Sequence, residues 1–154
     1  MEVIMQPQTK TAASVEQKYS YLPLPLYDDK PQLPYFNKQS DIHYKMDLNR
    51  YCIRKPQQTF FLRVTNENLL AWGIEVGDIL IIEQREQINE GDLVVIEQDD
   101  GLQLYEYFAM KDQQYVFFSL DSNHSNLTIK QLTQLNIQGV VASTIHQLKN
   151  RKAA

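Results

Sequence analysis

"RVTNENLLAWGIEVGDILIIEQ", residues Arg63 to Gln84, is the stretch that decides the predicted fold. It begins as a strand-like run, passes through a polar turn that contains Asn68, and continues into a short apolar stretch that fits a helical turn. Gly77-Asp78 then opens a second run of β-branched residues. Such runs, bounded by glycine turns, predict two β-strands joined by an ordered loop.

Strand-like runs continue from Thr59 almost to the end of the chain. They are separated by turn signals, of which Asp99-Asp100-Gly101 predicts a hairpin. The run from Asn126 to Leu135 fits either a short strand or one helical turn. Six or more short strands at this spacing predict a mostly-β fold, a small sandwich or a partly open barrel.

Composition excludes several classes of protein. The chain has 154 residues, 43% of them apolar and 22% charged, which is typical of one globular domain. The net charge of −4 and the absence of a basic stripe argue against direct nucleic-acid binding. No apolar run is long enough to span a bilayer, so no membrane association is expected. A single cysteine, Cys52, cannot form an internal disulfide and fits a cytoplasmic location.

No metal or cofactor site is expected. The three histidines lie far apart in the sequence and lack the spacing of metal ligands: His43, His124 and His146. We therefore interpret them as surface or hydrogen-bonded side chains. Asp99 and Asp100 are interpreted as turn residues.

The N-terminal part has a different composition from the rest. Five of the six prolines lie in the first 34 residues, whereas all five glycines lie from Gly73 onward. Proline removes backbone donors and restricts the residue before it, so the segment from Tyr21 to Phe36 is predicted to be extended. We predict an extended arm over residues 1–45 and a compact domain over residues 46–150.

The order and spacing of several segments resemble the C-terminal peptidase-like domain of the LexA/UmuD family, and its UmuD-like members most. The first segment is "TNENLLAWGIEVGDILII", in which Gly73, Ile74, Gly77 and Asp78 match the family pattern. The others are "INEGDLVVIEQDDGLQLYEY", "SLDSNHSNLTI" and "IQGVVASTIHQL". The resemblance runs from Asp47 to Leu148 and implies the β-fold of that family.

The chain departs from the family at the catalytic positions. Family members use a serine as nucleophile and a neutral lysine as its base, and these positions fall on Asn68 and Glu106. An amide nitrogen is delocalised and barely nucleophilic, and a carboxylate base has nothing to activate. The segment Asp28–Phe36 also lacks the Cys-Gly or Ala-Gly bond that relatives cut. We therefore predict a pseudo-peptidase, not an enzyme, in which Asn68 and Glu106 hydrogen-bond across the former site.

The resemblance implies a function in protein binding. UmuD-like proteins form dimers and act with a Y-family translesion polymerase, the replication clamp and the recombinase filament in the SOS response. The alternative is a regulator from a phage or mobile element that forms heterodimers with LexA- or UmuD-like proteins and alters their self-cleavage. The sequence alone leaves both open.

Two surfaces are predicted to make the contacts. Leu24, Pro25, Leu26 and Tyr27 resemble a clamp-binding segment of the family arm, but they can equally pin the arm to its own sheet. The resemblance implies that the run Ile137–Leu148 lies at a homodimer interface, because the matching terminal strand of the family pairs across its dimer; an open sheet edge also attracts another chain. Trp72 is expected to pack in the fold in preference to binding a partner.

Overall fold

The computed structural model describes residues 2–5, 24–26, 36–38, 44–69 and 72–148, with side chains from Met46 onward. The chain divides into two compact units, one of residues 1–7 and 57–154 and the other of residues 8–56. The predicted boundary after residue 45 stays a prediction. Among the described residues, no helix is both long and apolar enough to cross a membrane.

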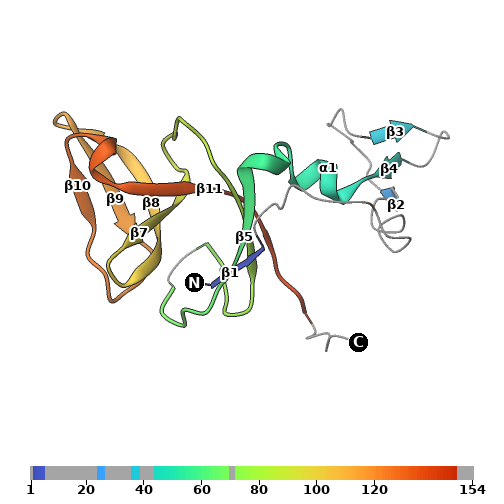
Figure 1. The fold of residues 1–154 in the computed structure, drawn as a ribbon, viewed down its shortest axis with the longest axis horizontal. Coiled ribbons are helices and arrows are strands. Elements are labelled where there is room, and N and C mark those ends of the chain that lie inside the picture. Colours follow the sequence, from blue (N-terminus) through green and yellow to red (C-terminus); the bar gives the residue numbers. More distant parts are fainter. Residues whose placement is uncertain (1, 6–23, 27–35, 39–43, 70–71, 149–154) are drawn as a thin grey trace. The chain divides into compact units, whose positions relative to one another are not determined.

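The smaller unit contains a three-stranded antiparallel sheet and one short helix (Figure 1). The strands are β2 (Leu24–Leu26), β3 (Phe36–Lys38) and β4 (Tyr44–Met46), in the order β2-β4-β3. The helix α1 (Leu48–Cys52) starts at Asp47, whose carboxylate accepts the backbone N–H groups of the next turn. Part of the predicted extended segment is therefore a strand in this unit.

The larger unit is one antiparallel sheet of eight strands in the order β1-β5-β6-β11-β7-β8-β9-β10. The mostly-β prediction is confirmed. The bounds of the strands and of two short 3-10 helices are β1 (Glu2–Met5), η2 (Pro56–Gln58), β5 (Thr59–Arg63), β6 (Ile79–Glu83), β7 (Leu93–Gln98), β8 (Gly101–Lys111), β9 (Gln114–Ser119), β10 (Leu127–Ile129), η3 (Leu132–Gln134) and β11 (Asn136–Ile145).

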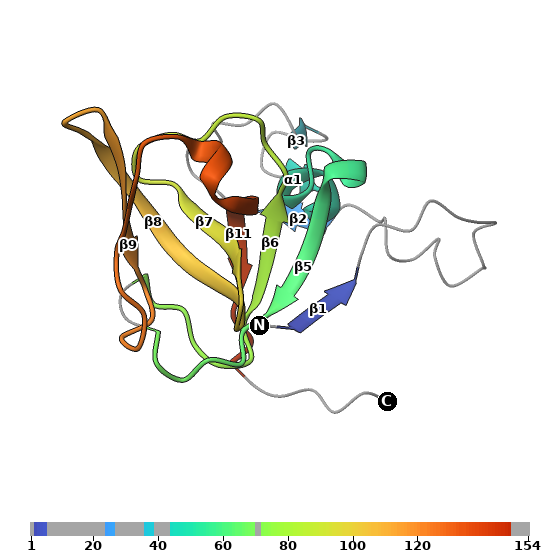
Figure 2. The same cartoon turned by 60° about the vertical axis from the view of Figure 1, so that its left-hand side comes forward.

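Strand β11 joins two parts of this sheet, as Figure 2 shows. Its first half, Asn136–Val140, pairs with β7, while Val140–Ile145 pairs with β6. Gly139 lies at this junction, where a Cβ atom would stand 2.7 Å from Ile82 Cγ2. A side chain at position 139 would therefore push the strands apart.

The two faces of the sheet carry separate hydrophobic clusters. Successive side chains of β7 point to opposite faces of the sheet. Leu93 and Val95 therefore lie in the first cluster, and Val94 and Ile96 lie in the second. All four side chains are at most 5% exposed. Because β7 is covered on both faces, its sequence is a continuous apolar run without polar alternation.

Local turns follow the predicted chemistry in most places. The β7–β8 hairpin turns at Asp99-Asp100, which confirms the prediction there. The ambiguous run from Asn126 to Leu135 contains both a short strand, β10, and the 3-10 helix η3. The helical turn predicted before Gly77 is wrong at its end, because Trp72 and Gly73 both have positive φ, 60° and 61°.

Candidate functional site

The turn that contains Asn68 is held in place by hydrogen bonds to its backbone. It begins two residues after Val64, whose N–H and C=O groups pair with Asp78 and Gly77. The side-chain oxygen of Asn66 accepts the N–H of Asn68 at 2.8 Å, which is an Asx turn. The C=O of Asn68 accepts the N–H of Ser122 at 3.3 Å.

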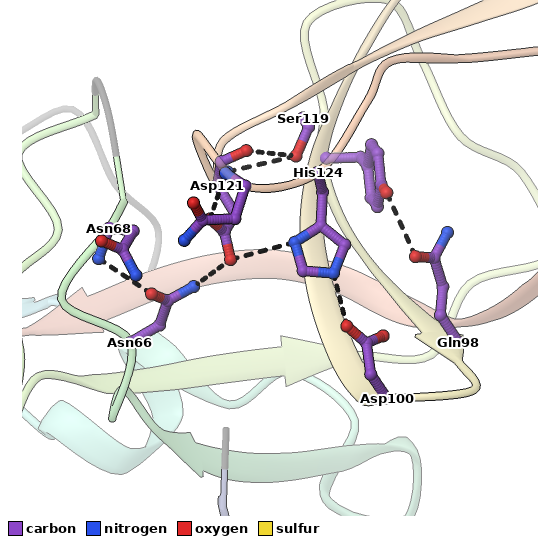
Figure 3. Close-up of polar contacts among 9 residues, drawn as sticks. Asn66, Asn68, Gln98, Asp100, Ser119, Asp121 and His124 are labelled. Carbon is purple, nitrogen blue, oxygen red and sulfur yellow. Dashed lines mark hydrogen bonds and ion pairs between the residues drawn. The ribbon is translucent and has the colours of Figure 1, made fainter.

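Asp121 is the centre of the polar contacts around this turn (Figure 3). Its residue is 4% exposed, and Leu69 pairs with it in an isolated β-bridge. One carboxylate oxygen accepts the amide of Asn66 at 2.7 Å, and the other accepts the N–H of Asn123 at 2.8 Å. The buried charge is therefore solvated by donors from two distant segments.

His124 connects Asp121 to the β7–β8 hairpin. Its Nε2 lies 2.6 Å from Asp100 Oδ2, and its Nδ1 lies 3.1 Å from Asp121 Oδ2. The second contact is an ion pair without hydrogen-bond alignment. Figure 3 shows the ring between the two carboxylates. We call Asn66, Asp100, Asp121 and His124 the polar brace.

The charges in the polar brace shift one another's pKa. The hydrogen bond to Asp100 raises the pKa of His124 above its ordinary value, against the opposing effect of burial. The same hydrogen bond lowers the pKa of Asp100. Burial acts to raise the pKa of Asp121, but the hydrogen bonds from Asn123 and Asn66 and the nearby charge of His124 outweigh it, and the pKa is lowered. These interactions thus favour the charged form of each of the three groups.

This arrangement does not support acyl transfer. A general base needs a nitrogen or carboxylate that can take a proton from a nucleophile in reach. Both nitrogens of His124 face carboxylates. Asn68, the residue expected at the position of the nucleophile, has only an amide. The contacts join three segments of the chain and stabilise the turn.

Glu106 lies on β8, between Leu93 on β7 and Phe118 on β9. Its side chain is on the same face as Leu104, which belongs to the first hydrophobic cluster. Among the described residues no hydrogen bond joins Asn68 to Glu106, so that expectation is wrong. The side chain of Asn68 is exposed, and its turn is held by Asn66 and Ser122 instead.

A groove opens on the other side of the same loop. Its cavity of about 330 Å³ is lined by two loop residues, by three residues at the start of β7 and by the second half of β11. The lining residues are Trp72, Ile74, Gly91, Asp92, Leu93, Val141, Ala142, Ser143 and Thr144. We call this cavity the Trp72 groove. Trp72 is 52% exposed, so the expectation that it packs in the fold is wrong.

A second histidine fixes the end of β11. His146 Nδ1 lies 2.6 Å from Asp78 Oδ1, and Asp78 is 3% exposed. The hydrogen bond to Asp78 raises the pKa of His146. His124 and His146 are thus hydrogen-bonded, as predicted, while His43 lies outside the described residues. No group of His, Cys, Asp and Glu in the described part of the chain has the geometry of a metal site.

The arm residues lie in the smaller unit. Leu24, Pro25 and Leu26 form β2, and their backbone pairs with Met46, Lys45 and Tyr44. Tyr27 lies outside the described residues.

Sequence reasoning missed the polar brace. Its members come from three separate turns, and Asn66 and Asp121 are 55 residues apart. The available signal was the polar run "SLDSNHSN" directly after a strand, since a polar cluster there must find partners in the fold.

Comparisons with known proteins agree with this geometry. The family model described as Peptidase S24-like matches residues 33–142. An uncharacterized protein of Haemophilus influenzae is 42% identical over 123 residues, which cover 80% of this chain and 83% of that protein. Protein SamA of Salmonella typhimurium is 32% identical over 111 residues, 69% of this chain and 72% of SamA. The LexA repressor of Aliivibrio fischeri is 37% identical over 60 residues, 39% of this chain and 27% of the repressor.

The matched range contains the loop of Asn68, the strand of Glu106 and most of β11. The mostly-β structure over this range agrees with the resemblance read from the sequence. The chain therefore belongs to the Peptidase S24-like family, the family of LexA- and UmuD-like proteins.

Proposed function

We propose that this chain is a non-catalytic, UmuD-like accessory protein of the SOS response and translesion DNA synthesis, which acts by binding other proteins. The observation that carries the proposal is Asn68. The resemblance read from the sequence puts it at the position of the family nucleophile. In the structure its side chain is exposed, and its backbone is hydrogen-bonded to Asn66 and Ser122. A well-ordered turn with no nucleophile favours a function in protein binding over a function in catalysis.

Self-processing tests the non-catalytic part of the proposal. The purified chain is incubated at alkaline pH, and separately with an activated recombinase filament, with a LexA repressor as positive control. We expect one full-length band while the repressor is cut. A discrete product ending between Asp28 and Phe36 would refute the proposal.

The double variant Asn68→Ser, Glu106→Lys separates the lost dyad from the lost target. The dyad residues return in this variant, but the arm still has no Ala-Gly or Cys-Gly bond. We expect the arm to stay intact, and a peptide that carries such a bond to be cut in trans. Cutting of the arm itself would show that the target is present after all.

We propose that the arm segment Leu24, Pro25, Leu26 and Tyr27 contacts a clamp or polymerase. Proline restricts this segment, so little backbone entropy is lost when it docks. The variant Leu26→Ala, Tyr27→Ala should weaken partner binding by roughly 1–4 kcal/mol, as for anchors in a groove. Unchanged affinity with a clear fall in melting temperature would instead assign the segment to the chain's own fold.

The second candidate function is a regulator that forms heterodimers with LexA- or UmuD-like proteins. The common family supports it, as does the second half of β11, one edge of which has no ladder partner among the described residues. Adding the chain to a cleavable relative should then change the rate of self-cleavage in proportion to heterodimer formed. An unchanged rate at saturating concentration argues for the first candidate.

We also propose a homodimer. Of the predicted interface, Ile137–Val140 pairs with β7 on one side, and Val140 also pairs with β6 on the other. The second half pairs with β6 on one side, and no described residue pairs with its other side. The domains proposed for this assembly are the arm of residues 1–45 and the fold of residues 46–150.

A further inference from the structure

The hairpin of β8 and β9 (Figure 2) exposes two aromatic side chains on one face of the sheet. Phe108 is 49% exposed and Phe118 is 36% exposed, and their ring centroids lie 4.7 Å apart. Ala109 and Val116 pair across the two strands beside them and are half-buried. Single exposed apolar side chains are common on protein surfaces, whereas adjoining ones indicate a binding surface. We call these four residues the hairpin patch.

One carboxylate adjoins the hairpin patch. Glu106 pairs directly with Phe118 across the strands, so the two side chains lie on the same face of the sheet. Glu106 is half-buried, and no hydrogen bond or ion pair joins its side chain to any residue that the structure describes. A half-buried carboxylate without a donor is unfavourable, so a cation bound at this place would be stabilising.

The ring and the carboxylate together fit an arginine side chain better than a lysine side chain. A guanidinium stacks on an aromatic ring within about 6 Å of the ring centroid, and its planar fork gives a carboxylate two parallel hydrogen bonds. Directly opposite side chains have Cβ atoms roughly 5 Å apart, so one guanidinium can lie over Phe118 and contact Glu106. A lysine ammonium lacks the planar shape that allows both contacts at once.

The far end of the hairpin patch carries the opposite charge. Lys111 is exposed and pairs with Gln114 at the end of the hairpin. The β-bulge after Tyr107 shifts the alternation of β8, so Lys111 faces the same side of the sheet as Phe108. The exposed apolar surface therefore lies between an acidic residue and a basic one.

The spacing of the two charges predicts the sequence of the occupant. Glu106 and Lys111 lie about 15 Å apart along β8, at roughly 3.3 Å per residue and with the bulge between them. An extended segment has its side chains i, i+2 and i+4 on one face and spans about 13 Å between the first and the last. Arginine at i, an apolar residue at i+2 and an acidic residue at i+4 would thus match this face of the hairpin.

Size and charge favour a short segment over a second copy of the folded chain. A stable interface between two folded proteins involves about 20–30 residues a side, whereas the hairpin patch has four residues and two flanking charges. Over residues 57–148, Asp and Glu number thirteen and Lys and Arg number four. A second copy would therefore bring mostly like charge to this face.

We propose that the hairpin patch binds an extended segment of another protein that carries arginine, an apolar residue and an acidic residue at alternate positions. The arginine lies over Phe118 and pairs with Glu106. The apolar side chain rests on Phe108, and the acidic side chain pairs with Lys111. This inference rests on the proposed protein-binding function and names one surface for it and the chemistry that this surface recognises.

A synthetic peptide tests the proposal. The capped probe Thr-Arg-Thr-Leu-Thr-Asp-Thr carries a fluorophore, and its anisotropy is measured as the full chain is added. We expect saturable binding that weakens as the salt concentration rises, because both ion pairs lie at the surface. A probe with citrulline in place of arginine keeps the shape and loses the charge, and it should bind about tenfold more weakly.

Variants of the chain identify the surface. Glu106→Gln removes the charge and Phe118→Ala removes the ring, and each should weaken binding of the arginine probe about tenfold. Met110→Ala is the control, at a side chain that is 52% exposed and pairs with Tyr115 on the other face of the hairpin, and it should leave the affinity unchanged. Glu106→Arg should restore part of the binding to a probe with glutamate in place of arginine. Urea denaturation of each variant checks that it is folded.

The outcomes separate this inference from the proposed function. The inference is overturned if the arginine probe does not bind at millimolar concentrations, or if binding survives both Glu106→Gln and Phe118→Ala. Equal binding of the arginine and citrulline probes overturns it as well. None of these results bears on whether the chain cuts itself. A chain that does so would overturn the proposed function and leave the peptide result as measured.

Discussion

Two turns of one loop differ sharply in how they are stabilised. The turn at Asn66–Leu69 has its backbone and its asparagine side chain hydrogen-bonded, and it rests on the buried Asp121. The turn at Trp72-Gly73, only a few residues later, has positive φ values and an exposed aromatic ring. We call the first the saturated turn, because its polar groups are hydrogen-bonded within the chain. We call the second the unsaturated turn, because its aromatic ring is exposed.

The difference shows where the chain has room for a partner. Asn68, the residue expected at the position of the family nucleophile, lies on the saturated turn, where the neighbouring polar groups are already hydrogen-bonded within the chain. The turn at Trp72 lines a groove together with the second half of β11, one edge of which has no ladder partner in the described part of the chain. A binding function is therefore expected at Trp72 and not at Asn68.

The largest effect is expected from Asp121→Ala, which breaks the saturated turn. The change leaves the amide of Asn66 and the N–H of Asn123 without their acceptor, and it removes the ion pair between Asp121 and His124. We expect a loss of about 3 kcal/mol in the free energy of unfolding, measured by urea denaturation. Glu86→Ala, which removes an exposed carboxylate, should change it by less than about 0.5 kcal/mol. Equal effects of the two changes would contradict a bracing role for Asp121.

Asn66→Ala should lower the free energy of unfolding by less, about 1–2 kcal/mol. In this variant Asp121 still accepts the N–H of Asn123 and keeps its ion pair with His124. The two changes should be non-additive in a double-mutant cycle, since both remove the same hydrogen bond. Additive losses measured in urea would show that Asn66 stabilises the turn independently of Asp121.

Trp72→Gly tests the unsaturated turn. Glycine adopts positive φ without strain, so we expect the isolated chain to gain roughly 0.5–1 kcal/mol in unfolding free energy. The same variant should lose the binding that depends on the ring. A less stable chain in dilute solution, where no dimer forms, would mean that the ring packs more than its exposure indicates.

The smallest effect is the pH dependence of the polar brace, because Asp100 is exposed to solvent. The raised pKa of His124 gives stability that is complete below about 6.5 and is lost as the pH rises through the raised pKa. The lowered pKa values of Asp100 and Asp121 give stability that is complete above about 3.8 and is lost as the pH falls through the lowered values.

The difference in unfolding free energy between the natural chain and His124→Gln should therefore be largest near pH 5 and shrink by pH 8.5. Besides the two aspartates, Tyr105 faces this group, and burial keeps its phenol protonated over that range by raising its pKa. His146 titrates in both proteins, so its contribution cancels. A difference independent of pH would show that His124 acts without its charge.

The strands were predictable because their signals are local. β-branched runs and an Asp-Asp-Gly turn specify the β7–β8 hairpin within a few residues. The groove and the polar brace were not predictable, because they depend on pairings between distant segments. Nothing near Asp121 indicates Asn66, and nothing in β11 indicates that it lies between β6 and β7. At Trp72 the local preference for a helical turn was overridden by the geometry that leads into Gly73.

The position of β11 also determines how the fold is reached. β6 and β7 follow each other in the sequence but are joined in the sheet only through β11, residues 136–145. During synthesis on the ribosome, β5 and β6 emerge with one apolar edge uncovered and β7 to β10 emerge with another, until β11 arrives. Because this pairing is long-range, it comes late and sets the pace of folding. A chain that ends before residue 136 would remain two half-sheets with exposed edges, a substrate for proteases and chaperones.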